Sequence, residues 1–276
     1  MLHEHIASQI YSNFSFTPTF GQKKIVESLS GWLADPDYSR IFILNGYAGT
    51  GKTSLIAAFV ATLKSLRVKP VLLAPTGRAA KVMTRHTGEK ASTIHKKIYR
   101  QKSSADPESA FSLDMNREKD ACFIIDEASM ISEGFGSDSL FGSGSLLDDL
   151  FKYIRQGTRC RVMFVGDNAQ LPPVGLEMSP ALDPRHMSNF GEVEYDSLDE
   201  VMRHSAESGI LFNATMVRCM LEAGIYEPPL FDMSYSAFRA ISGGELLDEV
   251  ATCYSEYGSD DTIIITRSHK RPNRLN

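Results

Sequence analysis

The alternation of apolar runs with helical patterns predicts an α/β fold built around a largely parallel sheet. Four short apolar runs have the length and the flanking turn residues of buried strands. They are residues 41–44, 71–74, 122–125 and 161–165. Leu55, Phe59 and Leu63 recur on one helix face after the first run. Strands that alternate with helices favour a doubly wound domain in which helices flank the sheet.

A glycine-rich segment joins the first run to its helix. Gly46, Gly51, Lys52 and Thr53 match the spacing GxxxxGK[ST] between a strand and a helix. Glycines let backbone N–H groups turn inward around phosphate oxygens, and the helix N-terminus adds partial positive charge. We expect Lys52 to reach the β- and γ-phosphates of a nucleotide and Thr53 to offer its hydroxyl to Mg²⁺. The other predicted nucleotide contacts are Ala48, Gly49, Thr50 and Ser54. An ordinary glycine turn that caps a helix is the alternative.

Length and composition indicate a globular protein of one large domain or two small ones in 276 residues. No apolar run approaches the ~20 residues of a membrane span, and no signal-peptide pattern is visible. The four cysteines form no CxxC pair and the histidines no zinc spacing, which favours a reduced, cytoplasmic location. A net charge of −5 argues against a surface covered with positive charge for non-specific nucleic-acid binding. A local groove that binds a nucleic-acid strand needs only a few basic and polar groups.

Two carboxylates follow the run at 122–125. Ligands of an open parallel sheet bind beyond the carboxyl ends of its strands, so Asp126 and Glu127 are expected near the phosphates held by the glycine loop. Asp126 would hold Mg²⁺, and Glu127 would orient and deprotonate the attacking water. A solvated strand end is the alternative.

The run at 161–165 leads into the segment GDNAQLPPVG at residues 166–175. Gln170 carries both a hydrogen-bond donor and an acceptor, so at a strand end it could touch the γ-phosphate and the attacking water. A simple Gly/Asp/Asn turn is the alternative.

The run at 71–74 opens a helix through a proline turn. Thr76 offers a hydroxyl, the turn offers free N–H groups, and basic side chains follow. This combination suits a nucleic-acid phosphate, although a plain helix cap has the same residues.

Five stretches together resemble superfamily 1 DNA helicases of the RecD/Dda branch (superfamily 1B), and they occur in the order of that family. They are GYAGTGKTS, LLAPTGRAAKVM, ASTIHKKIY, FIIDEASMI and FVGDNAQLPPVG. Two weaker matches flank them: FTPTFGQKKIVESL, with Gln22 as the adenine reader, and SLDEVMRHS, with Arg203 on the γ-phosphate. The resemblance covers about residues 14 to 210.

The resemblance implies a RecA-like P-loop NTPase domain that couples hydrolysis of ATP, with Mg²⁺, to movement along single-stranded DNA, usually 5′ to 3′. The positions it places near DNA are Thr76, Gly77, Thr93 and His95. Arg78 and Lys81 are further candidates for DNA contacts, with a solvated helix charge as the alternative for each. It also implies a small inserted β-hairpin within residues 97–120, where Phe111 and Tyr99 could stack on bases or pack under the hairpin. Membership of a DNA repair or recombination complex with a nuclease stays open.

The expected domain organisation follows from the same resemblance. Residues 1–260 form the first motor domain, with a flexible Gly/Ser loop near 132–146, and residues 261–276 begin a truncated second RecA-like domain with a strand at 262–266. We therefore expect a helicase fragment that hydrolyses ATP weakly, since such motors take a further arginine from the second domain. A naturally short protein is the alternative to a fragment. For the function, the alternatives are a nucleotide- and DNA-binding module without unwinding activity, or another class of P-loop NTPase.

Overall fold

The computed structural model describes residues 2–101, 111–132, 142–200 and 208–265. The chain divides into two compact units, residues 1–206 and 207–276. The expected domains 1–260 and 261–276 stay a prediction.

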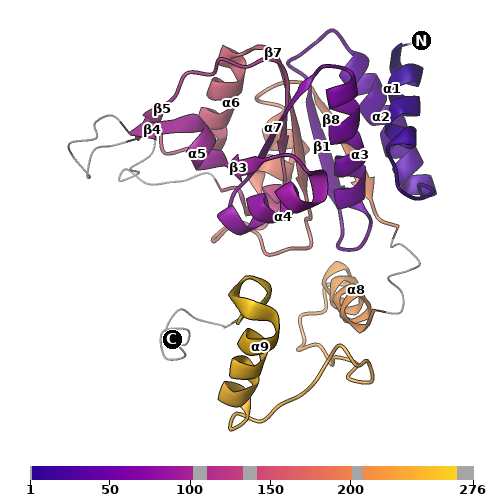
Figure 1. Ribbon diagram of the computed structural model, residues 1–276, viewed down its shortest axis with the longest axis vertical. Coiled ribbons are helices and arrows are strands. Elements are labelled where there is room, and N and C mark those ends of the chain that lie inside the picture. Colours follow the sequence, from indigo (N-terminus) through magenta and orange to yellow (C-terminus); the bar gives the residue numbers. More distant parts are fainter. Residues whose placement is uncertain (1, 102–110, 133–141, 201–207, 266–276) are drawn as a thin grey trace. The chain divides into compact units, whose positions relative to one another are not determined.

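The first unit is built on a six-stranded sheet in the order β3-β2-β6-β7-β1-β8, and every neighbouring pair is parallel (Figure 1). The strands are β1 Ile41–Gly46, β2 Lys69–Ala74, β3 Ala91–Thr93, β6 Lys119–Ile125, β7 Thr158–Gly166 and β8 Val193–Leu198. The predicted α/β class with a mostly parallel sheet is confirmed. The four predicted runs are β1, β2, β6 and β7, which are the four inner strands of the sheet. The edge strands β3 and β8 were not predicted.

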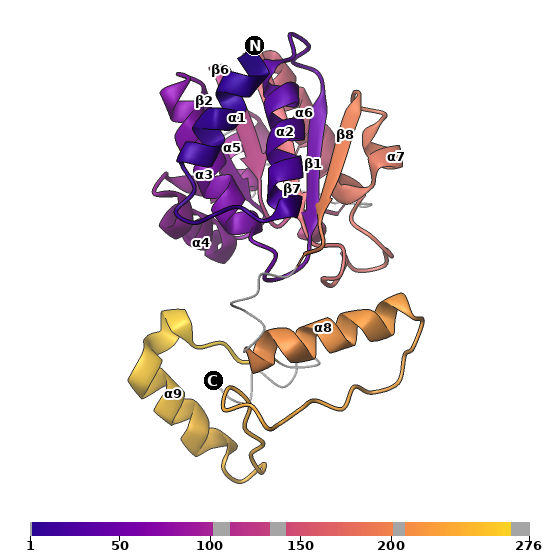
Figure 2. The same cartoon turned by 90° about the vertical axis from the view of Figure 1, so that its right-hand side faces the viewer.

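Helices cover both faces of this sheet (Figure 2). One face packs against α1 Leu2–Ser12, α2 Phe20–Ala34, α3 Lys52–Ser65 and α4 Gly77–Thr87, and the other against α5 Ile94–Ile98, α6 Leu146–Gln156 and α7 Pro184–Met187. Two short 3₁₀ turns, Ala128–Met130 and Pro180–Leu182, complete the second face. Successive side chains of a strand point to opposite faces of the sheet. Phe42 and Leu44 therefore belong to the hydrophobic core on the first face, and Ile41 and Ile43 to the core on the second face.

The inserted hairpin is confirmed in its described part. Strand β4, Tyr99–Gln101, pairs antiparallel with β5, Phe111–Leu113. Tyr99 is buried, and its hydroxyl donates to Asp149 Oδ2 of α6 at 2.9 Å, so this ring packs under the hairpin. Phe111 is partly buried against the same core, and its contact with DNA stays a prediction.

The Gly/Ser loop predicted near 132–146 falls mostly outside the described residues. The helix expected after it begins at Leu146, where the Ser145 hydroxyl accepts from the N–H of Asp148 at 3.2 Å. Asp148 and Asp149 in the first turn suit the positive end of the helix.

The second unit contains α8, Gly209–Glu222, and α9, Leu246–Asp261, which is kinked at Gly258. The strand predicted at 262–266 is wrong for residues 262–265, which adopt no strand. A strand needs a hydrogen-bonded neighbour, and none of the described strands pairs with this segment. The Thr262 hydroxyl instead donates to the carbonyl of Cys253 on α9 at 3.2 Å. Within the described part of the chain, no helix is long and apolar enough to cross a membrane.

Candidate nucleotide and nucleic-acid site

The carboxyl ends of the central strands meet at one edge of the sheet. In the registers, Asn45 of β1 lies beside Gly166 of β7, and Ile125 of β6 lies beside Phe164 of β7. The residues that follow these strands therefore gather around one pocket of about 560 Å³. Its lining residues are Tyr47, Ala48, Gly49, Gly51, Lys52, Thr53, Ile56, Val82, Met83, His86, Thr87, Asp126, Glu127 and Gln170.

The glycines of the loop are required for two different structural reasons, the backbone conformation and the close approach of a neighbouring strand. Gly49 and Gly51 adopt positive φ angles of 77° and 87°, a region that other residues rarely occupy. A Cβ on Gly46 would lie 2.9 Å from Leu198 Cβ, so the close approach of β8 requires glycine there. Gly51 is also the residue before α3, which places the free N–H groups of that helix beside Lys52 and Thr53. The loop thus has the geometry of a phosphate cradle.

Lys52 is folded over this cradle. Its Nζ donates to the carbonyl of Tyr47 at 2.8 Å and to the carbonyl of Gly46. Burial lowers the pKa of Lys52, while the charges of Asp167 and Asp126 oppose this effect. A weakly hydrated ammonium held this way interacts strongly with an anion that enters the pocket.

Asp126 and Glu127 both face this pocket. Burial raises the pKa of Asp126, although the N–H of Glu127 donates to its Oδ1 at 2.9 Å and Lys52 lies nearby. Burial, and then the charge of Asp126, raises the pKa of Glu127. Glu127 also adopts a φ of 53°, an uncommon conformation for a residue with a side chain. Such strain and raised carboxyl pKa values are typical of functional sites.

Gln170 closes the pocket from the loop after β7. Its amide hydrogen-bonds the Glu127 carboxylate, and its Oε1 accepts from the Ser129 hydroxyl at 3.5 Å. The predicted group Lys52, Thr53, Asp126, Glu127 and Gln170 is therefore brought together.

Asp167 belongs to this site and was not predicted. Its side chain is buried, its Oδ1 accepts from the N–H of Ala169 at 2.9 Å, and it exerts the largest charge effect on Lys52. The sequence signal was a carboxylate directly after a buried strand, which was interpreted as part of a turn.

Helix α4 supplies four further lining residues that the sequence did not indicate: Val82, Met83, His86 and Thr87. They reach the pocket because α4 lies across the strand ends, whereas α3 runs alongside the strands (Figure 1). The pattern of α4 predicts a helix, but no local spacing predicts its direction over the sheet.

Five predicted nucleotide contacts are not among the lining residues: Gln22, Gly46, Thr50, Ser54 and Arg203. Gln22 is fully buried: its Oε1 accepts from the N–H of Thr19 at 3.0 Å and its Nε2 donates to the carbonyl of Gly51 at 3.5 Å. The same amide thus caps α2 and contacts the glycine loop, and adenine reading by Gln22 stays a prediction. Arg203 lies outside the described residues.

The predicted DNA positions gather at the carboxyl ends of β2 and β3, where Ala74 lies beside Thr93. Thr76 caps α4 by accepting from the N–H of Ala79 at 3.2 Å, and Thr93 caps α5 by accepting from the N–H of Lys96 at 3.3 Å. His95 is partly buried, which lowers its pKa. The exposed residues Gly77, Arg78 and Lys81 continue along α4. Phe111 is on the separate hairpin.

The fold and this site define a P-loop NTPase. A family model described as an AAA domain matches residues 36–176, and the chain belongs to that family. The resemblance to the RecD branch of superfamily 1B helicases is confirmed.

Two curated proteins are similar to this chain over about half its length. The ATP-dependent RecD2 DNA helicase of Deinococcus radiodurans is 29% identical over 153 residues, which are 55% of this chain and 18% of that protein. The uncharacterized protein MJ1519 of Methanocaldococcus jannaschii is 36% identical over 150 residues, which are 50% of this chain and 12% of that protein. The chain thus spans less than a fifth of either relative. The crystal structure of Pif1 helicase from Candida albicans aligns with a TM-score of 0.47 and 17% identity, over 95% of this chain and 61% of that one.

Proposed function

We propose that this chain is the ATP-hydrolysing motor of a DNA helicase and couples hydrolysis to movement along single-stranded DNA, in the 5′ to 3′ direction. One observation carries the proposal: Lys52, Thr53, Asp126, Glu127 and Gln170 line one pocket although they come from three separate strand ends. The neighbouring DNA positions on β2 and β3, and the similarity to a helicase named ATP-dependent, support it further.

The residues present fit Mg²⁺. Asp126 is a partly buried carboxyl whose pKa is raised by desolvation, and it lines the same pocket as the Thr53 hydroxyl. No cluster of three or more His, Cys, Asp or Glu ligands occurs among the described residues, which suits an ion held through one carboxylate, a hydroxyl and the nucleotide phosphates. When bound, Mg²⁺ neutralises charge on the phosphate oxygens. Thr53 and Asp126 are its proposed ligands.

The chain's own residues divide the chemistry of hydrolysis. Lys52 exchanges its bonds to the loop carbonyls for bonds to the β- and γ-phosphates. Glu127, whose raised pKa makes its carboxylate a better base, accepts the proton of the attacking water at its side-chain oxygen. Gln170, already hydrogen-bonded to Glu127, orients that water toward the γ-phosphate. Arg203 as a γ-phosphate contact and Gln22 as an adenine contact belong to the same proposal.

We infer that Thr76, Gly77, Thr93 and His95 hold the backbone of single-stranded DNA, with Arg78 and Lys81 adding charge. The cap hydroxyls can still donate while they accept from the helix N–H groups. Work within a repair or recombination complex is part of this proposal.

The proposal includes weak turnover by this chain alone. No arginine occurs among the described residues that line the pocket. An arginine supplied to a phosphoryl-transfer site accelerates the reaction by about 10³–10⁵-fold where it has been measured. We infer that a second motor domain supplies it in the working helicase.

The test is ATP turnover by the purified chain with and without poly-dT. Lys52→Ala is expected to reduce turnover by about 10²–10³-fold, because it removes a preorganised cation from the phosphates. Lys64→Ala is the matched control, since Lys64 is on the same helix but pairs with Glu89 at the surface. Turnover that DNA stimulates and Lys52→Ala removes supports the motor, and turnover that survives Lys52→Ala contradicts the site.

The second candidate, a nucleotide- and DNA-binding module without unwinding activity, is favoured by the same lack of a described arginine in the pocket. It predicts binding of Mg·ATP that depends on Lys52, but no turnover with or without DNA.

A further inference from the structure

A second pocket lies at the amino ends of the strands, opposite the nucleotide site. It has a volume of about 220 Å³ and lies where the starts of β6 and β7 meet α1, the end of α2 and the residues after α3. We propose that it binds the C-terminus of a partner protein, an acidic segment that ends in a large apolar residue with a free carboxylate. This inference is independent of the proposed function, which uses the carboxyl ends of the strands.

The walls of this pocket are mostly apolar. Leu33 of α2 lines it together with Leu66 and Val68, which lie between α3 and β2, and all three are partly exposed. Their open apolar surface is therefore available to a ligand. The pocket is smaller than the roughly 300–1,000 Å³ of sites for drug-sized molecules, so it suits one apolar side chain that anchors a peptide.

Arg161 of β7 places a buried positive charge in the same pocket. The residue is only 4% exposed, and its guanidinium lies over the rings of Tyr38 at 4.4 Å and Trp32 at 5.5 Å. Burial lowers the pKa of Arg161, but a guanidinium stays protonated in proteins. The pocket thus combines apolar walls with a weakly hydrated cation.

This cation has hydrogen bonds but no ion pair in the described part of the chain. The Arg161 guanidinium donates to the carbonyl oxygens of Asp35 and Asp37. The Asp35 carboxylate pairs with Arg40 at 2.6 Å instead, and the Asp37 carboxylate accepts from the Ser39 hydroxyl at 2.7 Å. The two bonds leave other N–H groups of the guanidinium for a ligand. Because a buried cation without an anion is costly, a carboxylate that enters the pocket is strongly attracted.

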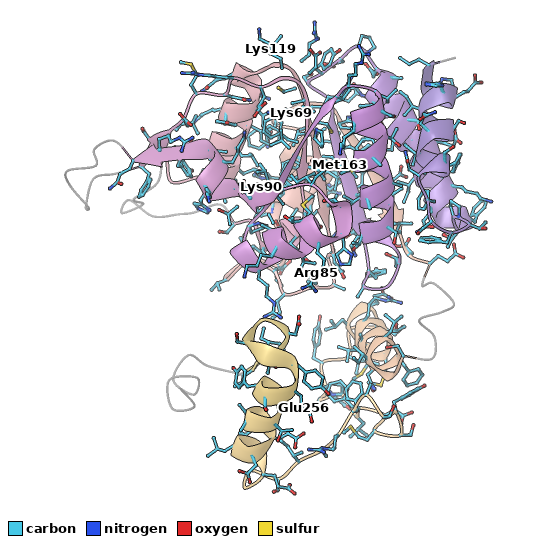
Figure 3. The ribbon with its side chains drawn as sticks, in the orientation of Figure 1. Lys69, Arg85, Lys90, Lys119, Met163 and Glu256 are labelled. Atoms are coloured by element: carbon cyan, nitrogen blue, oxygen red, sulfur yellow. The ribbon has the colours of Figure 1, made fainter. Side chains whose placement is uncertain are left out.

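Exposed cations at the rim favour an acidic chain behind that carboxylate. Arg67 lies between two lining residues and Lys119 directly precedes a third, and neither forms an ion pair among the residues that the structure describes. Arg159 differs, because the Asp120 carboxylate accepts from its Nη2 at 2.6 Å. Figure 3 shows Lys119 at the end of the sheet opposite Arg85 of α4. Unpaired cations at the mouth contrast with the net charge of −5 of the whole chain.

The backbone around the pocket is also unusual. Arg67, Asp120 and Arg159 have φ angles of 60°, 49° and 52°, in the left-handed region that residues with side chains rarely adopt. The only other such residue in the described ranges is Glu127, which lines the nucleotide pocket. Because strained residues gather at ligand sites, the amino end of the sheet shares this property with the nucleotide site.

The experiment measures binding of a peptide to the full chain by fluorescence anisotropy. The probe is a short run of aspartates that ends in phenylalanine with a free carboxylate and carries fluorescein at its N-terminus. We expect saturable binding at physiological salt. The same peptide with a C-terminal amide, or with alanine as its last residue, should bind at least about tenfold more weakly. One lacks the carboxylate and the other lacks the apolar anchor.

Two variants test the cations. Arg161→Gln keeps donors for the two carbonyl groups but removes the charge, and we expect it to raise the Kd of the peptide by about tenfold or more. Lys119→Glu reverses an exposed charge at the rim and should raise the Kd by about threefold. Lys90→Glu is the matched control and should leave the Kd unchanged. Lys90 is also an exposed lysine at the start of a strand, but it does not line this pocket (Figure 3).

Thermal melts establish which variants fold. If Arg161→Gln does not fold, the peptide series and Lys119→Glu decide. Absence of saturable binding, or an amide peptide that binds as well as the acid, overturns the inference. An equal loss in Lys119→Glu and Lys90→Glu also overturns it, because it indicates non-specific attraction between charges.

Competition distinguishes this pocket from other ligands and sites. N-acetylphenylalanine should not displace the peptide at comparable concentration, and displacement would assign the pocket to a free small acid instead of a peptide. Mg·ATP and oligo-dT should not displace it either, because their proposed sites lie at the carboxyl ends of the strands. Displacement by any of the three overturns the inference. Failure of the chain to bind nucleotide would contradict the proposed function alone.

Discussion

The two units of the chain differ most in what they bury. In the first, large side chains such as Phe42, Phe123 and Phe164 are fully buried on the two faces of the sheet. In the second, the described residues 208–265 include no buried apolar side chain. Tyr226 and Leu230 are 84% and 90% exposed. The first unit is thus stabilised by hydrophobic burial, and the second depends on local bonds.

Those local bonds centre on Asn213 of α8, whose side chain is buried. Its Nδ2 donates to the carbonyls of Gly209 and Asp232 at 3.0 and 3.1 Å, and its Oδ1 accepts from the N–H of Asp232 at 2.7 Å. Phe212 and Tyr235 add a ring contact at 5.5 Å. The difference teaches that a compact segment can be fixed by one satisfied amide with little hydrophobic core, at a much lower stability than a two-sided sheet.

The largest effect that tests this comparison is a cavity in the first unit. Phe164→Ala is expected to lower the free energy of unfolding by about 3–5 kcal/mol, because the ring is fully buried between β7 and α6. Phe231→Ala, at a half-exposed ring of the second unit, is expected to change it by less than about 1 kcal/mol. Urea unfolding followed by circular dichroism measures both. Equal losses in the two variants would mean that the second unit has a core that its exposures do not indicate.

A smaller and more local effect is expected at Asn213. Replacing it with alanine leaves the partly buried N–H and carbonyl of Asp232 without their partners, which costs about 1–3 kcal/mol. Hydrogen exchange should accelerate in residues 208–235 and stay unchanged in the sheet of the first unit. Asn189→Ala is the matched control, because the Asn189 amide donates only to His186 at an exposed position. Faster exchange throughout the sheet would contradict the independence of the two units.

The sequence predicted the parts of the fold that depend on continuous patterns. Strands β1, β2, β6 and β7 are apolar runs because both faces of a central parallel strand are buried. The edge strands β3 and β8 were missed because β3 has three residues and β8 is only partly buried, so neither shows such a run. The strand expected at 262–266 was wrong over the described residues 262–265, because a strand needs a neighbouring strand as well as an apolar composition.

The residues of the candidate site also divide into those that the sequence predicted and those that it did not. Lys52, Asp126 and Gln170 were predictable because each lies in a recognisable segment that follows a predicted apolar strand. His86 and Thr87 were not, because the direction of α4 over the sheet depends on tertiary packing. Gln22 shows a different limit: the amide expected to read adenine also completes the capping box of α2, and the sequence pattern is the same for both roles.

The smallest expected effect concerns the negative charge of Glu127 in the candidate nucleotide site of the first unit. The pKa of Glu127 is raised, so the folded state binds this proton more readily than the unfolded state does. The ionised carboxylate therefore destabilises the fold at pH values above its raised pKa, and the penalty disappears as the pH falls toward the ordinary value of 4.5.

Glu127→Gln keeps an acceptor for Gln170 without the charge. We expect it to raise Tm by roughly 2–4 °C near pH 8, with a difference that vanishes near pH 4.5, while ATP turnover is lost. The exposed Glu177→Gln should change neither quantity. A lower Tm for Glu127→Gln near pH 8 would mean that the Glu127 carboxylate stabilises the first unit, and that its strained conformation and burial are offset by contacts with Lys52.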